Sequence, residues 1–294
     1  MLSSFKIINK YFWKSLFGPG ILFVFSILVL FIFTTIWDLM GIFDYVALLP
    51  SVYSSVIVTV CIFTIPVTIN NLINSLILKR IGCSKISKSN FLIATFIFYL
   101  SMCILSVLWM IVFGFAIFSA DLNKYISVLK CINIPEYIFA FFLNFIFAAS
   151  IGMFILTFTK RNYVIGIVAF IILVLGTVMA CLYVPLTIFH KYSPYINSNN
   201  KIGFQFYIVY FHPFWYTTAL QTEAFYGNGN NIVNVYGSSI FALQEYMFTF
   251  TSNIESVCIP SLLPYDKCLD LFLPTGLSIG FIIYDCLKFT WSRR

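Results

Sequence analysis

The side chains that could carry out acid–base, nucleophilic or metal chemistry are few in this chain of 294 residues. The only two histidines, His190 and His212, lie far apart and do not have the spacing of a metal-binding helix. No glycine is followed by lysine, so the glycine-rich loop that binds nucleotide phosphates is missing. The eight cysteines contain no Cys-x-x-Cys pair. The sequence therefore predicts no catalytic centre, no metal site and no cofactor on this chain.

The composition indicates a membrane protein. The chain is 61% hydrophobic and only 9% charged, with a mean hydropathy of +0.97, whereas soluble domains carry about 25% charged residues. So few ionic side chains do not cover a surface in water, which excludes an ordinary soluble enzyme, a disordered protein and a nucleic-acid binder. We expect an all-α membrane protein with one membrane domain over residues 1–294.

Six segments are long and apolar enough to cross a bilayer, which takes about 20 residues in a helix. They are residues 17–37, 48–69, 91–120, 137–159, 163–188 and 271–287. The sixth contains Pro274 and is expected to begin earlier, near Ser261. A seventh span at residues 202–220 is an alternative. The sequence favours instead a re-entrant or surface-lying segment of a large outer region, residues 191–270.

The basic residues set the expected orientation. With six spans, 12 of the 17 Lys and Arg residues fall on one side of the membrane. They are Lys6, Lys10, Lys14, Lys79, Arg80, Lys85, Lys88, Lys160, Arg161, Lys288, Arg293 and Arg294. Because cytoplasmic loops carry the excess of Lys and Arg, both termini are predicted to lie in the cytoplasm, with the chain in the plasma membrane. A seventh span would send the last three outside.

Polar and small residues within the spans indicate contacts between helices. Asn144 is the most polar side chain well inside a span, and it either lines a translocation path or, as we favour, forms a hydrogen bond between helices. Asp285 is expected to pair with Lys288. The segments 148–152 and 276–280 have small residues four positions apart, which let helix backbones approach closely. Contacts within the chain explain them as well as contacts with a second copy.

Residues 1–16 have the pattern of an interfacial helix. Lys6, Lys10 and Lys14 recur every four residues on one face, and Phe12 lies on an apolar face with Trp13 beside it. Such a helix lies at the membrane surface with its lysines toward anionic headgroups.

Residues 69–90 are predicted to form an amphipathic helix that leaves the membrane, followed by a short basic turn. One face of this helix is apolar and ends in a basic residue: Ile69, Leu72, Ile73, Leu76, Ile77 and Arg80. The other face is polar: Asn70, Asn71, Asn74 and Ser75. The segment is either a solvated connection between two spans or a docking element for a cytoplasmic partner.

This order of features resembles the permease subunit of an ABC-2 type transporter. That family has a basic interfacial helix, six spans, a cytoplasmic helix between spans two and three and a sizeable outer region between spans five and six. Residues 79–92 resemble its K-R-x-G…-[IL]-S-[KR]-x-x-F-L stretch, and Lys288, Phe289 and Trp291 resemble its cationic, aromatic C-terminal motif. The chain departs from the family where Asn70, Asn71 and Asn74 replace the usual Glu. It departs again at residues 212–213, which are His-Pro instead of Asn-Pro.

The resemblance implies a non-catalytic exporter subunit that forms the translocation pathway as a homodimer or heterodimer with a second permease chain. Two copies of a separate P-loop ATPase would bind ATP and Mg²⁺ and dock on a coupling segment: Leu72, Asn74, Leu76, Lys79, Arg80, Gly82, Ser84 and Lys85. The path or an outer gate would include Asn144, His212, Pro213, Phe214 and Trp215. Membrane lipids are also expected as partners of the chain.

Two other functions remain open from the sequence: a structural or scaffolding membrane protein, and, less favoured, a membrane-embedded enzyme. Cys61 and Cys103 are expected to pack as small apolar side chains within spans. A disulfide between Cys258 and Cys268, at the end of the outer region, is also left open.

Overall fold

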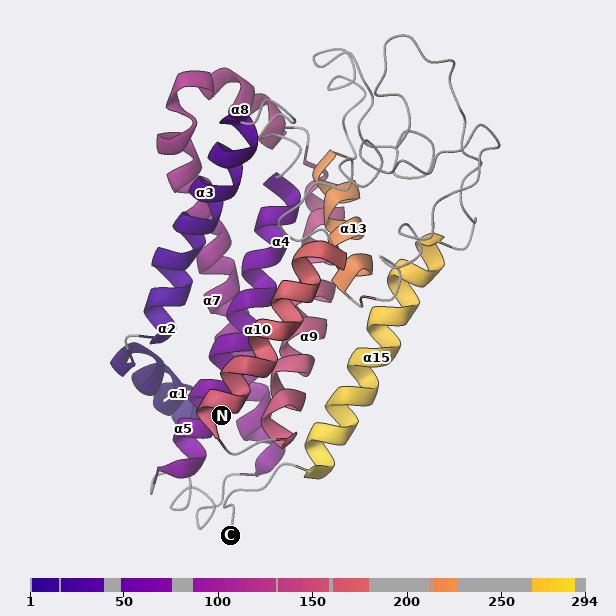
Figure 1. The fold of residues 1–294 in the computed structure, drawn as a ribbon. Helices are drawn as coiled ribbons and strands as arrows, with labels where there is room; N and C mark the ends of the chain where they lie inside the picture. Colours follow the sequence, from indigo (N-terminus) through magenta and orange to yellow (C-terminus); the bar gives the residue numbers. More distant parts are fainter. Residues whose placement is uncertain are drawn as a thin grey trace.

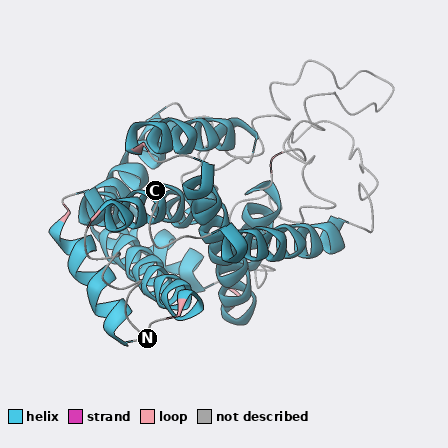
Figure 2. Ribbon diagram, turned by 90° about the horizontal axis from the view of Figure 1, so that it is seen from below, coloured by secondary structure: helices cyan, strands magenta, loops and turns pink. Residues whose placement is uncertain are grey.

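In the computed structural model, every regular element of the described residues is a helix. The structure describes residues 2–15, 17–39, 49–75, 87–130, 132–158, 161–179, 212, 214–226 and 266–288. The elements run in the following order: α1 (Leu2–Lys14), α2 (Phe17–Pro19), the π-helix η1 (Gly20–Phe25), α3 (Ser26–Leu39), α4 (Leu49–Thr59), the π-helix η3 (Val60–Thr64), α5 (Ile65–Asn74), α7 (Lys88–Ile117), the 3₁₀ turn η4 (Ser119–Asp121), α8 (Leu122–Lys130), α9 (Ile134–Phe158), α10 (Asn162–Met179), α13 (Phe214–Tyr226) and α15 (Asp266–Lys288). The helices pack side by side as a bundle (Figures 1 and 2).

Five helical segments are long and apolar enough to cross a membrane: Phe17–Thr35, Leu49–Asn74, Lys88–Ile117, Ile134–Thr157 and Leu271–Lys288. The prediction of an all-helical fold is thus confirmed for the described residues, and these helices are consistent with a multi-pass membrane protein. The expected fifth span at 163–188 corresponds to α10, which is described to residue 179 and whose apolar part, Asn162–Gly176, is shorter. The six-span topology stays a prediction.

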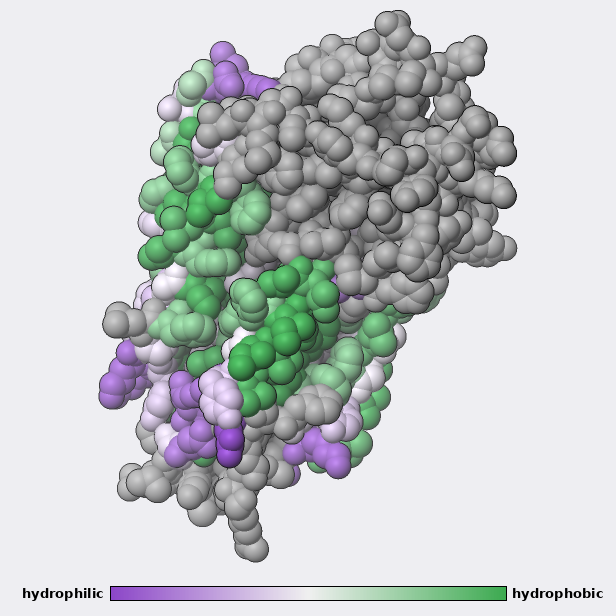
Figure 3. Space-filling model, in the orientation of Figure 1, coloured by the Kyte–Doolittle hydropathy of each residue, from purple (hydrophilic) through white to green (hydrophobic). Residues whose placement is uncertain are grey.

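The two ends of the bundle differ in charge as expected. The lower end in Figure 1 holds α1, the end of α5, the start of α10 and the end of α15, and the upper end holds α8. Lys6, Lys88, Arg161 and Lys288 belong to the lower end, and Lys124 and Lys130 to the upper end. Purple, hydrophilic side chains gather at the lower end and at the tip of the upper end, with apolar residues between them (Figure 3). The basic segments therefore share one end of the bundle, as the charge pattern predicted.

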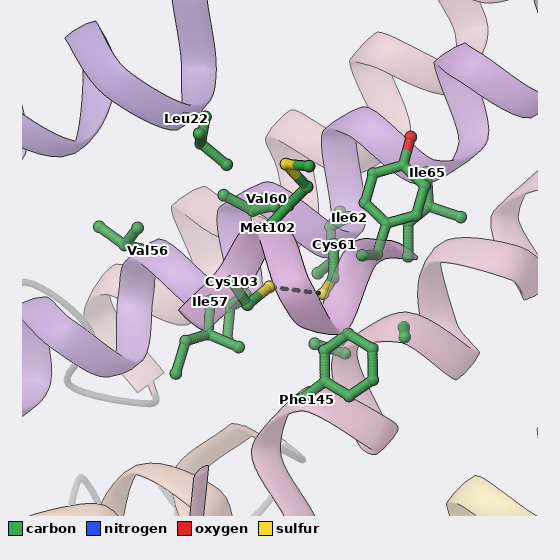
Figure 4. Close-up of a cluster of buried hydrophobic side chains, with 14 of the residues drawn as sticks. Leu22, Val56, Ile57, Val60, Cys61, Ile62, Ile65, Met102, Cys103 and Phe145 are labelled. Carbon is green, nitrogen blue, oxygen red and sulfur yellow. Dashed lines mark hydrogen bonds between the residues drawn. The ribbon is translucent and has the colours of Figure 1, made fainter. Parts of the chain in front are cut away.

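The continuous helix of α4, η3 and α5 is the centre of the bundle. Its most apolar stretch is 89% buried, against 17% for α15. Cys61 in η3 and Cys103 in α7 meet in this core with their sulfur atoms 3.7 Å apart, among side chains such as Val60, Ile57 and Phe145 (Figure 4). Both cysteines are fully buried, so the prediction that they pack as small apolar side chains is confirmed.

The N-terminal helix α1 has the two faces that the sequence predicted. Ile8 and Phe12 are fully buried, and the Phe12 ring lies 5.3 Å from the ring of Phe98 in α7. Lys6, Lys10 and Lys14 are exposed. The helix is thus fastened to the bundle by its apolar face, with its lysines on the free side.

Helix α5 ends earlier than the sequence pattern predicted. Its apolar residues Ile69, Leu72 and Ile73 are buried as expected. However, the helix stops at Asn74, and Ser75 is extended with ψ of 153°. The Ser75 amide still donates to the Asn71 carbonyl at 3.1 Å, and the Ser75 hydroxyl donates to the Leu72 carbonyl at 2.6 Å. An uninterrupted helix from Ile69 to Arg80 is therefore wrong, and residues 76–86 lie outside the described residues.

The two segments with small residues four positions apart, 148–152 and 276–280, differ in their surroundings. Ala148 and Gly152 of α9 are buried within the chain, so an internal contact explains them. On α15, a Cβ atom at Gly276 or Gly280 would meet no atom of the described chain within 4 Å. Among the described residues, only the first of the two segments thus forms a close contact within the chain.

Candidate functional site

Helix α13 is a short helix inserted among the longer ones. It packs against α4, α9, α10 and α15. Near its start, the ring of Phe214 lies 5.1 Å from the ring of Phe147, half-way along α9. Near its end, the Ala224 carbonyl accepts a hydrogen bond from the Asn133 amide, just before α9 begins, at 2.9 Å. Thus α13 runs from the middle of the bundle to its upper end, antiparallel to α9 (Figure 1).

A cluster of uncharged polar side chains joins α13 to α4 and α9. Asn144 Nδ2 donates to Ser54 Oγ at 3.0 Å and to Gln221 Oε1 at 3.2 Å. The hydroxyl groups of Ser54 and Thr218 lie 3.2 Å apart. All four side chains are buried, three of them completely. We call Ser54, Asn144, Thr218 and Gln221 the polar cluster. The prediction that Asn144 forms a hydrogen bond between helices is confirmed, and its place on a translocation path stays a prediction.

Two atoms of the polar cluster have no hydrogen-bond partner. They are Asn144 Oδ1, an acceptor, and Gln221 Nε2, a donor. Burying an unpaired polar group costs free energy, because the group loses its bonds to water. The polar cluster therefore keeps one uncharged acceptor and one uncharged donor that could take other partners if the helices moved.

His212 and the aromatic residues after it form the inner end of α13. His212 is 7% exposed, and its ring lies 5.7 Å from that of Phe214. Its carbonyl accepts a hydrogen bond from the Trp215 amide at 3.0 Å. The imidazole faces the backbone of Ile172 in α10, and among the described residues its Nδ1 has no hydrogen-bond partner.

The structure brings the predicted path residues together in part. His212, Phe214 and Trp215 share the start of α13, and Asn144 contacts the same helix two turns later, at Gln221. Pro213 lies outside the described residues. Sequence reasoning missed Ser54, Thr218 and Gln221, because small hydroxyl groups within apolar helices are common and Gln221 lies in a segment rich in aromatic residues.

At the upper end, tyrosines fasten α13 and α8 to α4. The hydroxyl groups of Tyr53 and Tyr125 lie 3.0 Å apart, and the Tyr53 ring stacks on Phe225 at 5.8 Å. Tyr125 also donates to the Ile111 carbonyl at 3.2 Å. Burial raises the pKa of Tyr125, and the bond to Tyr53 opposes that rise. The Tyr125 hydroxyl therefore stays protonated at neutral pH and acts as a hydrogen-bond donor.

At the lower end, three asparagines connect α5 with α10. Asn70 Nδ2 donates to Asn162 Oδ1 at 2.5 Å, and Asn162 Nδ2 donates to Asn71 Oδ1 at 2.8 Å. Asn70 is fully buried, although the helical pattern placed it on the polar face with the exposed Asn71 and Asn74. This contact pairs the Nδ2 of the buried Asn70 amide without water.

The remaining predicted coupling and C-terminal residues are placed only in part. Leu72 is buried in the core, and Asn74 is exposed at the end of α5. Leu76, Lys79, Arg80, Gly82, Ser84 and Lys85 lie outside the described residues. Lys288 is exposed at the end of α15, and Phe289 and Trp291 also lie outside the described part.

The expected ion pair between Asp285 and Lys288 is wrong. Asp285 is 4% exposed, and neither of its carboxylate oxygens has a hydrogen-bond partner. The reason is the register of α15: Asp285 shares its buried face with Ser278 and Pro274, where the ring of Phe281 packs on Phe154 of α9 at 4.6 Å. Lys288 points to solvent instead. Within the described residues, no three His, Cys, Asp or Glu side chains gather in a way that could hold a metal ion.

No protein-family model matches the sequence, and no curated protein or solved structure matches it either. The resemblance to ABC-2 permeases therefore rests on the residues and motifs quoted above and stays a prediction.

Proposed function

We propose that this chain is the membrane permease subunit of an ATP-driven exporter, with ATP hydrolysis on a separate cytoplasmic chain. The observation that carries the proposal is the polar cluster where α13 enters the bundle. A protein that only fills a membrane gains nothing from an unpaired acceptor and donor in its core. A pathway that closes and reopens needs polar groups that can exchange partners.

In this proposal the lower end of the bundle faces the cytoplasm, as the excess of basic residues there supports. Helix α13 is then a re-entrant element that extends from half-way across the membrane to the outer side. Short helices at membrane depth are tolerated where they are enclosed by protein or line a cavity. We assign α13 the role of an outer gate, held closed by the polar cluster.

The first test asks whether an ATPase binds the chain. We expect a P-loop ATPase to co-purify with the tagged protein in polymer discs at about one copy per chain, and its turnover to depend on the permease. Changing Lys79 and Arg80 to Glu should detach the ATPase and leave membrane insertion intact. A permease that captures no ATPase after crosslinking in the membrane would overturn the proposal. If the variant with both Lys79 and Arg80 changed to Glu still binds the ATPase normally, these two residues have no coupling role.

The second test addresses the gate. Ser54→Cys combined with Thr218→Cys places two thiols where two hydroxyl groups are now 3.2 Å apart. Oxidation by copper phenanthroline joins α4 to α13 through a disulfide. We expect the bound ATPase to lose its permease-dependent turnover and to regain it with a reductant. Each single variant is the matched control, and a fully crosslinked complex with unchanged turnover would exclude a moving α13.

A further inference from the structure

Helix α10 is attached to the rest of the molecule by polar contacts at two levels. At its first residue, the side-chain amide of Asn162 bridges Asn70 and Asn71 of α5. Ten residues later, about 15 Å along the helix, α10 packs against α13, and the Ile172 backbone faces the imidazole of His212. His212 is in turn bonded to the first turn of α13 through the Trp215 amide. One helix thus contacts the end of α5 and the start of α13.

The rest of α10 is suited to move as one body. Its outer face is apolar and exposed at Ile167, Phe170 and Val174. Its inner face is buried at Ile165, Ala169 and Leu173, whose side chains are apolar and uncharged. No proline interrupts residues 162–179, so the helix has no built-in kink at which movement would be lost.

We propose that α10 is a rigid link that carries movement of α5 to α13, with Asn162 and His212 as its two attachment points. The inference rests on the proposed function, because it states how docking of an ATPase at the lower end would reach the gate. Asn162 is a positioning residue in this scheme: it touches neither nucleotide nor cargo.

The chemistry of Asn162 suits this role. Its amide accepts from Asn70 and donates to Asn71, so both of its polar atoms are used on neighbouring residues of one helix. A pull on α5 acts on α10 through both bonds. Ala removes the two bonds, whereas a disulfide between positions 71 and 162 would replace them with a covalent link.

The experiment measures whether ATP moves α13. In the complex with its ATPase, the yield of the disulfide between Ser54→Cys and Thr218→Cys is compared without nucleotide and with ATP plus vanadate. We expect ATP to change the yield when Asn162 is intact. With Asn162→Ala, the ATPase should bind as before, the yield should no longer respond to ATP, and permease-dependent turnover should fall about tenfold, as expected for the loss of two neutral hydrogen bonds.

Two further variants keep the test decisive. Asn123→Ala removes an exposed asparagine of α8 and should leave the response to ATP intact. Asn71→Cys with Asn162→Cys should recover the ATP dependence of turnover after oxidation, which separates loss of linkage from loss of folding. An Asn162→Ala complex that folds and responds fully to ATP, or an oxidised cysteine pair that stays unresponsive, would overturn the inference.

A double-variant cycle tests that the two attachments act in series. His212→Phe keeps a ring beside Phe214 but removes the imidazole that faces the Ile172 backbone. If α10 links the two sites, Asn162→Ala combined with His212→Phe should lower turnover no further than the more severe single change. If the effects of the two single variants on turnover multiply in the double variant, α10 does not link the two sites, and the exporter proposal is unaffected. A native chain that binds no ATPase would overturn the exporter proposal, and this inference with it.

Discussion

Gly152 of α9 lies directly against the backbone carbonyl of Cys61: a Cβ atom at position 152 would be 2.6 Å from that oxygen. The contact brings α9 onto the π-helix η3 at the centre of the bundle. A backbone oxygen cannot move aside as a flexible side chain can.

Gly152→Ala should therefore destabilise the protein by about 1–3 kcal/mol, in the range of overpacked cores. The measurement is the thermal unfolding midpoint in detergent. Gly166→Ala in α10 is the matched control, because a Cβ there meets nothing within 4 Å, and its midpoint should stay equal or rise. A Gly152→Ala protein as stable as the control would show that α9 and η3 are further apart.

Gly114 in α7 and Tyr125 in α8 form a second close contact, in which a Cβ at position 114 would collide with the tyrosine hydroxyl. Gly114→Ala should lower the unfolding midpoint. The same Cβ would lie 2.5 Å from Tyr125 Cζ, a ring carbon that Phe would keep. Tyr125→Ala removes the ring and its hydroxyl, with the bonds to Tyr53 and Ile111. In the Tyr125→Ala background the added Ala at position 114 should cost clearly less than in the native one. Equal costs in both backgrounds would contradict this contact.

Asn144 and Gln221 allow stability and function to be separated. Asn144→Leu leaves Gln221 Oε1 buried without its partner, whereas Ser54 keeps Thr218, and should cost about 1–3 kcal/mol. Adding Gln221→Met removes the orphaned amide and should recover part of the midpoint. We expect this double variant to be more stable than Asn144→Leu yet inactive in ATPase stimulation. Recovery of both properties would mean that the polar cluster only packs the core.

Asp285 should be a source of instability in the folded protein. A buried carboxylate without a partner costs free energy that an amide of the same shape avoids in part. Asp285→Asn is expected to raise the unfolding midpoint, and Lys288→Gln to leave it unchanged because Lys288 makes no ion pair with Asp285. A drop in the midpoint for Lys288→Gln would indicate an electrostatic role for this lysine.

The class of fold and the positions of five long apolar helices followed from hydropathy alone. The two faces of α1 followed from the spacing of its lysines. Both succeed because they depend on local sequence: a bilayer sorts segments by apolar length, and a helix repeats every 3.6 residues. The end of α5 was missed because the apolar pattern does not record the change of backbone conformation at Ser75.

The sequence by itself determined that the chain folds into long apolar helices suited to a membrane. It also determined that the basic residues gather at one end of the bundle. What only the tertiary structure decided is which polar groups meet. Asn144 and Gln221 are 77 positions apart, and Asn70 and Asn162 are 92 apart. Hydrophobicity is a property of each segment, whereas a hydrogen bond between helices depends on the rotation and depth of both, which packing alone sets. The burial of Asp285 without Lys288 has the same cause.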